Sequence, residues 1–174
     1  MFGSREFSAL LATSVVLILA PTACQHGSQE AVNQGVPSSP ERLRSDFRRD
    51  LSRDEQAGGH TLRKHVGQSD EQLRERLESE PNLAAASTYT DRDTAERVIG
   101  LAIEENRDKV ARWLARSGRR PNLVLEYDSG PERPVGRTLA RGGNHSHPCS
   151  HALVVLRWNG NREYYVLTSY PECA

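Results

Sequence analysis

Proton-handling side chains are concentrated in the short segment from His60 to Gly67. This octapeptide holds two of the six histidines in the chain. An imidazole with an ordinary pKa near 6.5 exchanges protons close to neutral pH, so His60 or His65 is a candidate general acid or base. Lys64 is a third candidate, because its ammonium group can stabilise a negative charge. The alternative is that His65 packs at the edge of the core, beside the apolar face of a short helix.

Candidate anion-binding groups occur in two other places. Arg76 lies on a predicted helix, and its planar guanidinium either binds a phosphate or is a solvated surface charge. Thr168 and Tyr170 lie two residues apart in a predicted strand, so their hydroxyls are expected on one face. Both residue types also favour strands for packing reasons alone. These residues supply the parts of an acid–base and anion-binding site without proving that they act together.

A rival site lies between residues 145 and 151. Four potential ligands occupy every second position there: His145, His147, Cys149 and His151. Imidazole and thiolate groups on one face of a strand could bind zinc or copper. However, Pro148 disrupts regular strand pairing, and a disulfide between Cys149 and Cys173 would remove the sulfur ligand. We therefore expect a polar, solvated strand entry here and no metal.

The helices that must position these groups are predicted from apolar periodicity. A short helix ends at Gly67, and a second begins with a capping box at Ser69. Residues 82–89 are expected to form a loop of small side chains. A single long helix ending at Gly118 follows, because its apolar residues recur every three or four positions.

From Pro121 onward the apolar period changes to two, which predicts strands. The expected strands cover residues 123–127, 135–140, 152–158 and 163–170. Helices followed by antiparallel strands predict an α+β fold, with helices packed on a curved sheet. The last two strands form a hairpin whose register places Cys149 opposite Glu172. Since Cys173 is the next residue, the two cysteines are candidates for one disulfide in an oxidising compartment.

The N-terminal part of the sequence is predicted to direct export. Arg5 precedes an apolar run of about a dozen residues, too short to span a bilayer, which indicates a signal peptide at residues 1–24. The end of this segment resembles a bacterial lipobox, so Cys24 is a candidate for lipidation; plain secretion and a buried apolar helix are the alternatives. Residues 25–57 are polar and are expected to form a flexible linker. An extension packed on the domain is the alternative for these residues.

The overall composition excludes little. The chain has 174 residues, 36% of them hydrophobic, and a formal net charge of zero. These values are typical of a globular domain with a tail, and they provide no basic field of the kind that attracts polyanions. Charge therefore argues neither for nor against RNA as a ligand.

The compact region, residues 58–174, is similar to the bacterial ribonuclease A-like toxin domain found at the C-termini of contact-dependent growth inhibition proteins and related polymorphic toxins. The similarity consists of short motifs in a fixed order, Gly58-Gly59-His60-Thr61-Leu62-Arg63-Lys64-His65-Val66-Gly67, Ser69-Asp70, Leu73, Arg76-Leu77, Ala86-Ser87-Thr88-Tyr89-Thr90-Asp91, Ala95-Glu96, Pro134-Val135-Gly136-Arg137 and Tyr165-Val166-Leu167-Thr168-Ser169-Tyr170-Pro171. It implies a fold like that of the pancreatic ribonucleases, without their dense disulfides. It also implies an endoribonuclease that needs no metal or cofactor.

The resemblance further implies a role for four residues. The family's active-site histidine corresponds to His65, its phosphate-contacting arginine to Arg76, and its closely spaced hydroxyl residues to Thr168 and Tyr170. Cleavage by 2′-hydroxyl transphosphorylation, which leaves a 2′,3′-cyclic phosphate, needs a base, an acid and donors for the charge on the phosphoryl oxygens. His65 is expected to transfer protons, and Arg76 and Thr168 to hold the phosphate. Tyr170 would orient the phosphate, donate a proton or stack on a base.

The expected partners follow from these predictions. RNA is the expected substrate, a cognate immunity protein is a candidate inhibitor, and lipidated Cys24 would attach the chain to a membrane. The expected localisation is outside the cytoplasm, as a cell-envelope lipoprotein or a secreted protein. His60 and Lys64 stay as alternatives for the catalytic role. The alternative function is a non-catalytic envelope lipoprotein in which the same fold binds a ligand or partner.

Overall fold

The computed structural model describes residues 47–173, which fall within one compact unit. The helices are α2 (Leu51–Gln56), α3 (Thr61–His65), α4 (Asp70–Ser79), α5 (Arg92–Glu105) and α6 (Arg107–Ala115). The strands are β1 (Ala85–Tyr89), β2 (Leu123–Asp128), β3 (Gly136–Ala140), β4 (His147–Cys149), β5 (His151–Gly160) and β6 (Glu163–Glu172). Among these helices, none is long and apolar enough to cross a bilayer. The predicted signal peptide and Cys24 lie outside the described residues.

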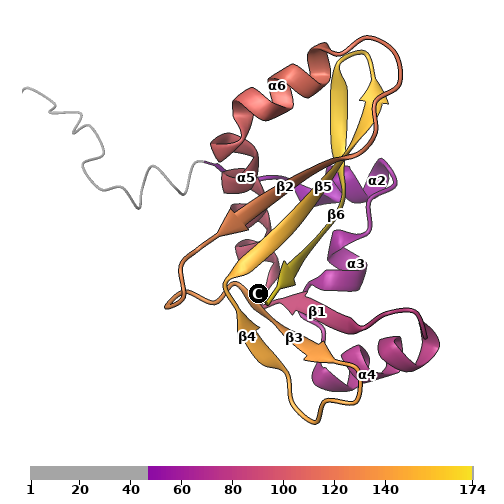
Figure 1. Ribbon diagram of the computed structural model, residues 1–174, viewed down its shortest axis with the longest axis vertical. Coiled ribbons are helices and arrows are strands. Elements are labelled where there is room, and N and C mark those ends of the chain that lie inside the picture. The colour runs from indigo at the N-terminus through magenta and orange to yellow at the C-terminus, as the bar shows by residue number, and fades with distance from the viewer. Residues whose placement is uncertain (1–46, 174) are drawn as a thin grey trace, which may run out of the picture. The chain divides into compact units, whose positions relative to one another are not determined.

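The described strands form two antiparallel sheets of three strands each, with the orders β1-β3-β4 and β2-β5-β6. Strand β5 is the central strand of the second sheet and forms a long hairpin with β6, and α5 packs against β2 and β5 (Figure 1). Helices α2 and α3 lie beside β6, while α4 packs on β1 and β3. Strand β4 of the first sheet leads through Ser150 into β5 of the second. This arrangement confirms the predicted α+β class.

Two groups of buried apolar side chains hold the elements together. The larger group joins α5 and α6 to the second sheet and includes Ile99, Trp113, Leu125, Val154, Leu156 and Val166. The smaller group lies under α4 and contains Leu73, Leu77, Ala86 and Leu139. The capping box predicted at Ser69 is present: its hydroxyl accepts from Gln72 N, and the Gln72 side chain accepts from Ser69 N.

The linker prediction is wrong for residues 47–57, which pack on the domain. Leu51 is fully buried in the larger core, and Asp50 caps α2 by accepting from Ser52 N. The chain also passes so close to α5 that a Cβ on Gly100 would lie 1.9 Å from the Phe47 carbonyl oxygen. Sequence periodicity missed this segment because a single buried leucine anchors it. The rest of the predicted linker, residues 25–46, lies outside the described residues.

The loop predicted before Tyr89 is a strand. Four of the five residues of β1 are buried, and β1 pairs with β3 from Ala85 opposite Ala140 to Tyr89 opposite Gly136. Small side chains obscured the strand in the sequence, because they fit a crowded interior without showing apolar alternation. Tyr89 is fully buried and its hydroxyl lies 2.6 Å from Ser169 Oγ on β6, which links the first sheet to the second.

The single long helix predicted before Gly118 is two helices, α5 and α6. They meet at Asn106, whose backbone leaves the helical region with φ −106° and ψ 17°. The Asn106 side chain donates to the Ala102 carbonyl oxygen at 2.9 Å and so satisfies the end of α5. The apolar spacing continues through the break because both helices pack on the same core.

The predicted register of the β5–β6 hairpin is off by two positions at its base. His151 lies opposite Glu172, where Cys149 was expected, because the turn falls on Asn161 and Arg162 with φ 48° and 63°. Cys149 and Cys173 are nevertheless paired, with Cα atoms 4.8 Å apart. This separation lies in the ordinary range for a disulfide.

A bulge in β6 also changes which side chains share a face. Thr168 lies opposite Val155 but Val166 lies opposite Leu156, so Leu167 is the extra residue. Val166 therefore faces the core with Leu156, while Thr168 and Tyr170 lie on the other face of the sheet. Unbroken alternation along the strand would place Val166 on the same face as Thr168, and the bulge prevents this.

Candidate active site

His65 is the last residue of α3, and its side chain is turned into the protein. Only 6% of the residue is exposed. Its Nδ1 lies 3.1 Å from the carbonyl oxygen of Ser87 on β1. Because a carbonyl oxygen only accepts hydrogen bonds, Nδ1 carries the proton and donates it. This tautomer leaves the lone pair of the other ring nitrogen, Nε2, available as a base.

The surroundings of His65 favour its neutral form. Burial, followed by the positive charge of Arg76, lowers the pKa of His65 from 6.5 to about 3. The hydrogen bond to Ser87 opposes this shift, but it is the smaller effect. At neutral pH His65 is therefore an uncharged proton acceptor. A phosphate anion placed beside it would raise the pKa again, because opposite charges favour the protonated imidazole.

Arg76 reaches His65 from the second helix, α4. One guanidinium nitrogen, Nη1, donates to the Lys64 carbonyl oxygen at 3.3 Å and lies 3.5 Å from His65 Nδ1. Since Nδ1 already carries a proton, this second contact is electrostatic. Nε of Arg76 donates to Glu80 at 3.3 Å, one turn further along α4. The side chain is thus partly buried and held in place while its charge stays close to the imidazole.

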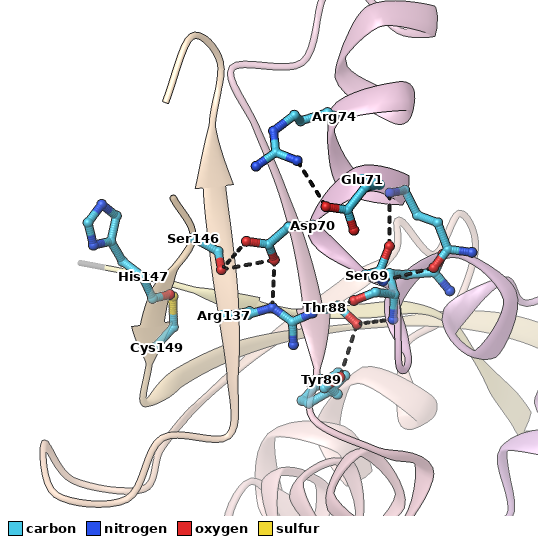
Figure 2. A network of polar contacts seen from close by, with 12 residues as sticks. Ser69, Asp70, Glu71, Arg74, Thr88, Tyr89, Arg137, Ser146, His147 and Cys149 are labelled. Atoms are coloured by element: carbon cyan, nitrogen blue, oxygen red, sulfur yellow. Dashed lines mark hydrogen bonds and ion pairs between the residues drawn. The ribbon is translucent and has the colours of Figure 1, made fainter. Parts of the chain in front are cut away.

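A polar network fastens α4 to the first sheet (Figure 2). The Asp70 carboxylate accepts from Arg137 Nε at 2.9 Å and from the Ser146 hydroxyl at 3.0 Å. Arg137 also donates to the Gln68 carbonyl oxygen at 2.6 Å, and Gln68 N donates to Thr88 Oγ1 at 3.0 Å. The hydrogen bond from Arg137 lowers the pKa of Asp70, so the carboxylate stays charged. These contacts fix the start of the helix that carries Arg76.

Tyr170 reaches His65 from β6, and Thr168 lies two residues before it on the same face of the strand. The rings of Tyr170 and His65 have centroids 5.4 Å apart, with their planes inclined by 31°. Burial raises the pKa of Tyr170, and Glu172 adds to this effect, so its hydroxyl keeps its proton. The Thr168 Oγ1 atom is buried and makes no hydrogen bond to any residue that the structure describes. A buried hydroxyl without a partner is unusual and fits a group that binds a ligand.

The bulge beside Thr168 is held by α2 and α3. Asp54, 2% exposed, accepts from Val166 N at 2.9 Å and forms two hydrogen bonds with the Arg49 guanidinium at 2.9 and 2.7 Å. His60 N donates to the Leu167 carbonyl oxygen at 3.0 Å. These contacts provide hydrogen-bond partners for backbone groups of β6 at the bulge, where regular strand pairing is interrupted. They also fix the strand immediately before Thr168.

His60 and Lys64, the alternative catalytic residues, border the site. The ring centroid of His60 lies 6.3 Å from that of His65, and burial, with help from Arg63 and Lys64, lowers the pKa of His60. The Lys64 ammonium forms an exposed ion pair with Glu80 at 3.3 Å. His65 differs from both by its burial and by its contact with the Tyr170 ring. The geometry therefore ranks His65 first.

The rival metal segment does not assemble a metal site in the part of the chain that is described. No group of three histidine, cysteine or acidic side chains there could hold an ion. The reason is topological: His147 pairs with Thr138 in the first sheet, whereas His151 pairs with Asp128 in the second. The alternation seen in the sequence does not continue through the turn between β4 and β5.

Two supports of the site were not found by sequence reasoning. The Ser87 carbonyl that orients His65 lies on β1, which was expected to be a loop. Asp54 lies on α2, which was assigned to the linker. A run such as Thr88-Tyr89, with residues that favour strands, was the signal for β1. No comparable signal existed for Asp54, because an aspartate in a polar segment resembles a solvated charge.

Comparisons with known proteins assign the chain to a family. Residues 59–171 match the model of the bacterial CdiA-CT RNAse A domain. A crystal structure of a CdiA-CT/CdiI complex from Y. kristensenii 33638 is similar, with a TM-score of 0.58 and 30% identity over 66% of this chain and 99% of that chain. No curated protein matches the chain. Since the family model covers more than half of the chain, the protein belongs to the bacterial CdiA-CT RNAse A domain family. The resemblance expected from the sequence is confirmed.

Proposed function

We propose that this protein is an exported endoribonuclease that cleaves RNA without a metal ion. The observation that carries the proposal is the convergence of His65, Arg76 and Tyr170. Arg76 Nη1 lies 3.5 Å from His65 Nδ1, and the Tyr170 and His65 ring centroids are 5.4 Å apart. A neutral imidazole, a cation and a protonated phenol in one place supply the base, anion-binding and donor functions of phosphodiester cleavage. Membership of an RNase A-like toxin family supports the same conclusion.

In the proposed reaction, Nε2 of His65 accepts the proton of the ribose 2′-hydroxyl. The 2′-oxygen forms a bond to phosphorus, the bond between phosphorus and the 5′-oxygen breaks, and a 2′,3′-cyclic phosphate remains. Arg76 and the Thr168 hydroxyl stabilise the charge on the phosphoryl oxygens. Tyr170 donates its proton to the departing 5′-oxygen. His65 then releases its extra proton to solvent and the Tyr170 phenolate takes a proton from solvent, so the reaction balances without a cofactor.

The low pKa of His65 in the free protein fits this scheme when substrate charge is included. An imidazole with a pKa of about 3 is always in the base form at neutral pH but is a weak base. A bound phosphodiester places a negative charge beside His65 and neutralises the effect of Arg76. The imidazole therefore becomes a stronger base only when substrate is present.

Export and partner binding complete the proposal. The predicted signal peptide would carry the chain to an oxidising compartment, where the Cys149–Cys173 pair would form a disulfide. Lipidation of Cys24 would then attach the protein to a membrane. The similar CdiA-CT chain is in complex with CdiI, which supports a cognate immunity protein for this chain as well. A non-catalytic envelope lipoprotein with the same fold is the alternative, favoured by the neutral net charge.

The decisive experiment incubates the purified chain with single-stranded RNA in EDTA. We expect degradation with cyclic phosphate ends and a loss of roughly 10²–10⁴-fold in His65→Ala. His147→Ala, which removes an exposed histidine from another part of the fold, is the matched control. Undiminished activity in His65→Ala would reject the site. Absence of RNA cleavage, with no toxicity on cytosolic expression, would favour the lipoprotein alternative.

A further inference from the structure

A second group of basic and aromatic side chains lies away from the candidate active site. A pocket of about 590 Å³ is lined by Arg119, Arg120, Pro121, Asn122, Arg157 and Trp158. Its residues belong to the segment between α6 and β2 and to the far end of the β5–β6 hairpin. These two stretches lie at the top of the view in Figure 1. The lining contains three arginines and no acidic residue. The pocket is therefore locally basic in a chain whose formal net charge is zero.

The three arginines of this pocket are among the eight of the eighteen arginines in residues 47–173 that form no ion pair with a carboxylate there. Ten arginines elsewhere in the described residues form ion pairs with carboxylates. Arg119, Arg120 and Arg157 form none within residues 47–173. In addition, Nε of Arg120 is buried and has no hydrogen-bond partner among those residues. A guanidinium held without a counter-charge is a ready site for an anion.

Arg120 and Trp158 form a flat surface beside these charges. The guanidinium carbon of Arg120 lies 4.3 Å from the centre of the Trp158 ring, and Trp158 is 38% exposed. The segment is held in place because the buried Trp113 donates to the Pro121 carbonyl oxygen at 2.8 Å. Stacked aromatic and guanidinium planes are the surfaces on which unpaired bases stack. The pocket thus offers the two groups that bind a nucleotide: a cation for the phosphate and a flat surface for the base.

One arginine of the pocket, Arg157, lies on the same face of the sheet as the candidate active site. Arg157 lies two residues from Val155 on β5, and Val155 pairs with Thr168. Because residues two apart on a strand share a face, Arg157 and Thr168 point to the same side. Trp158 pairs with Tyr164, so the pocket lies roughly 13 Å along β6 from Thr168. Trp158 follows Arg157 and faces the other side, so a single strand leaving the active site along this face would reach Arg157 first and the Trp158 ring only beyond it.

The charged residues on this face of the sheet favour one direction for a bound strand. On the same face of β2, Glu126 and Asp128 lie toward the end of the sheet opposite to the pocket, whereas Val124 lies nearer to Arg157. A polyanion is repelled by the acidic end and attracted by the arginine end. The bound strand is therefore expected to run toward the hairpin turn.

We propose that the pocket formed by Arg119, Arg120, Arg157 and Trp158 is a second binding site for single-stranded RNA, which holds the substrate strand away from the bond that is cleaved. This proposal rests on the proposed ribonuclease function. In the proposed reaction Arg76 binds only the phosphate that is cleaved. The second site would bind the rest of the substrate strand. An acidic protein partner is the competing occupant that the test must exclude.

Binding is measured first, with an oligonucleotide that cannot be cleaved. A 2′-deoxy decanucleotide lacks the attacking hydroxyl, and Trp158 reports on its binding because Trp113, the other tryptophan, is only 4% exposed. We expect the full chain to show quenched tryptophan emission. Arg157→Gln should weaken binding about tenfold, through the loss of one charge-assisted phosphate contact. It should also reduce the slope of log K against log salt by about 0.7.

The matched control is Arg133→Gln, which removes the same charge from an exposed arginine in the loop between β2 and β3. We expect this variant to bind as the unmodified chain does. Equal weakening in both variants would overturn the proposal, because it would show only an effect of net charge. Equal quenching by polyglutamate and by the decanucleotide would also overturn it, in favour of an acidic protein partner.

Cleavage assays distinguish an error in the proposed second binding site from an error in the proposed active site. With RNA substrates, the ratio of kcat/KM for a decanucleotide to that for a dinucleotide should fall about tenfold in Arg157→Gln and stay constant in Arg133→Gln. Cleavage with an unchanged ratio in Arg157→Gln would reject the second site and keep the proposed function. Binding that depends on Arg157 without any cleavage would support the second site and reject the proposed function.

Discussion

The two ends of β6 are built in different ways. Near Glu172 the strand is tightly surrounded: Ser169 contacts the buried Tyr89 hydroxyl at 2.6 Å, and Cys173 is paired with Cys149. Near the hairpin turn the strand ends beside Trp158, which is exposed, and beside arginines that have no ion pairs among the described residues. The bulge at Leu167 separates the two ends.

The two ends suit two different tasks, proton transfer and capture of the substrate, which have opposite structural requirements. Proton transfer needs groups fixed in position, and His65 is fixed by its hydrogen bond to Ser87 and by burial. Capture of a flexible polyanion needs accessible charge that is not already neutralised by carboxylates. The enclosed end of β6 suits the first task and the open end suits the second. Substitutions at the two ends of β6 should therefore affect different properties of the protein.

The largest effect is expected at Arg76. Arg76→Gln should lower RNA cleavage by about 10²–10³-fold, because it removes a donor for the charge that develops on the phosphate. It should also raise the pKa of His65, since the Arg76 cation lowers that pKa. Steady-state kinetics and an NMR titration of the imidazole measure the two effects. Arg74→Gln, on the same helix but exposed, should change neither; equal losses in both variants would contradict the assignment.

Asp54 tests whether α2 supports the strand at the bulge. Asp54→Asn leaves the Arg49 cation without its buried partner and should lower the free energy of unfolding by about 3 to 4 kcal/mol. Urea unfolding measures the change. Glu104→Gln breaks an exposed ion pair with Arg107 and should cost less than about 1 kcal/mol. A loss from Asp54→Asn no larger than that from Glu104→Gln would show that residues 47–57 are dispensable for the fold.

The disulfide is expected to stabilise the enclosed end of β6. Cys149 and Cys173 are separated by 24 positions, and closing a loop of this size stabilises a fold by about 3 kcal/mol in the chain-entropy model. Replacing both cysteines with serine should lower the unfolding free energy by that amount and leave binding of the 2′-deoxy decanucleotide unchanged. Unfolding curves with and without a reducing agent provide the measurement. Identical curves for the oxidised and reduced chain would exclude a stabilising bond.

At neutral pH the smallest effect is expected from His65, which makes stability depend on pH only in acid. Because folding lowers its pKa from 6.5 to about 3, the neutral imidazole stabilises the fold fully above pH 6.5. This contribution is lost as the pH falls toward 3, where the unfolded chain binds a proton that the folded chain does not. The slope should reach about 1.4 kcal/mol per pH unit within this window. Unfolding at a series of pH values should give a shallower slope for His65→Gln, and parallel slopes would contradict the buried, neutral state.

The sequence was informative where a pattern is local. The capping box at Ser69 needs only the residues beside it, and the alternation from Leu123 to Tyr127 predicted β2 almost to the residue. It was uninformative where an element depends on distant partners. The strand β1 consists of small residues whose burial follows from its position between β3 and β6. The bulge at Leu167 is stabilised by Asp54 and His60, which lie more than a hundred residues away in the chain.

The candidate site shows the same division. The residue types, their order and the resemblance to a family can be read from the sequence, because each depends only on short stretches of neighbouring residues. The folded arrangement was needed to show that Nδ1 of His65 donates to Ser87 and that a bulge separates Thr168 from Val166. It also showed that the arginines near Trp158 lack carboxylate partners in the described residues. The burial of a side chain, its tautomer and its counter-charge all depend on neighbours that folding brings together. The order of residues along the chain does not show which neighbours these are.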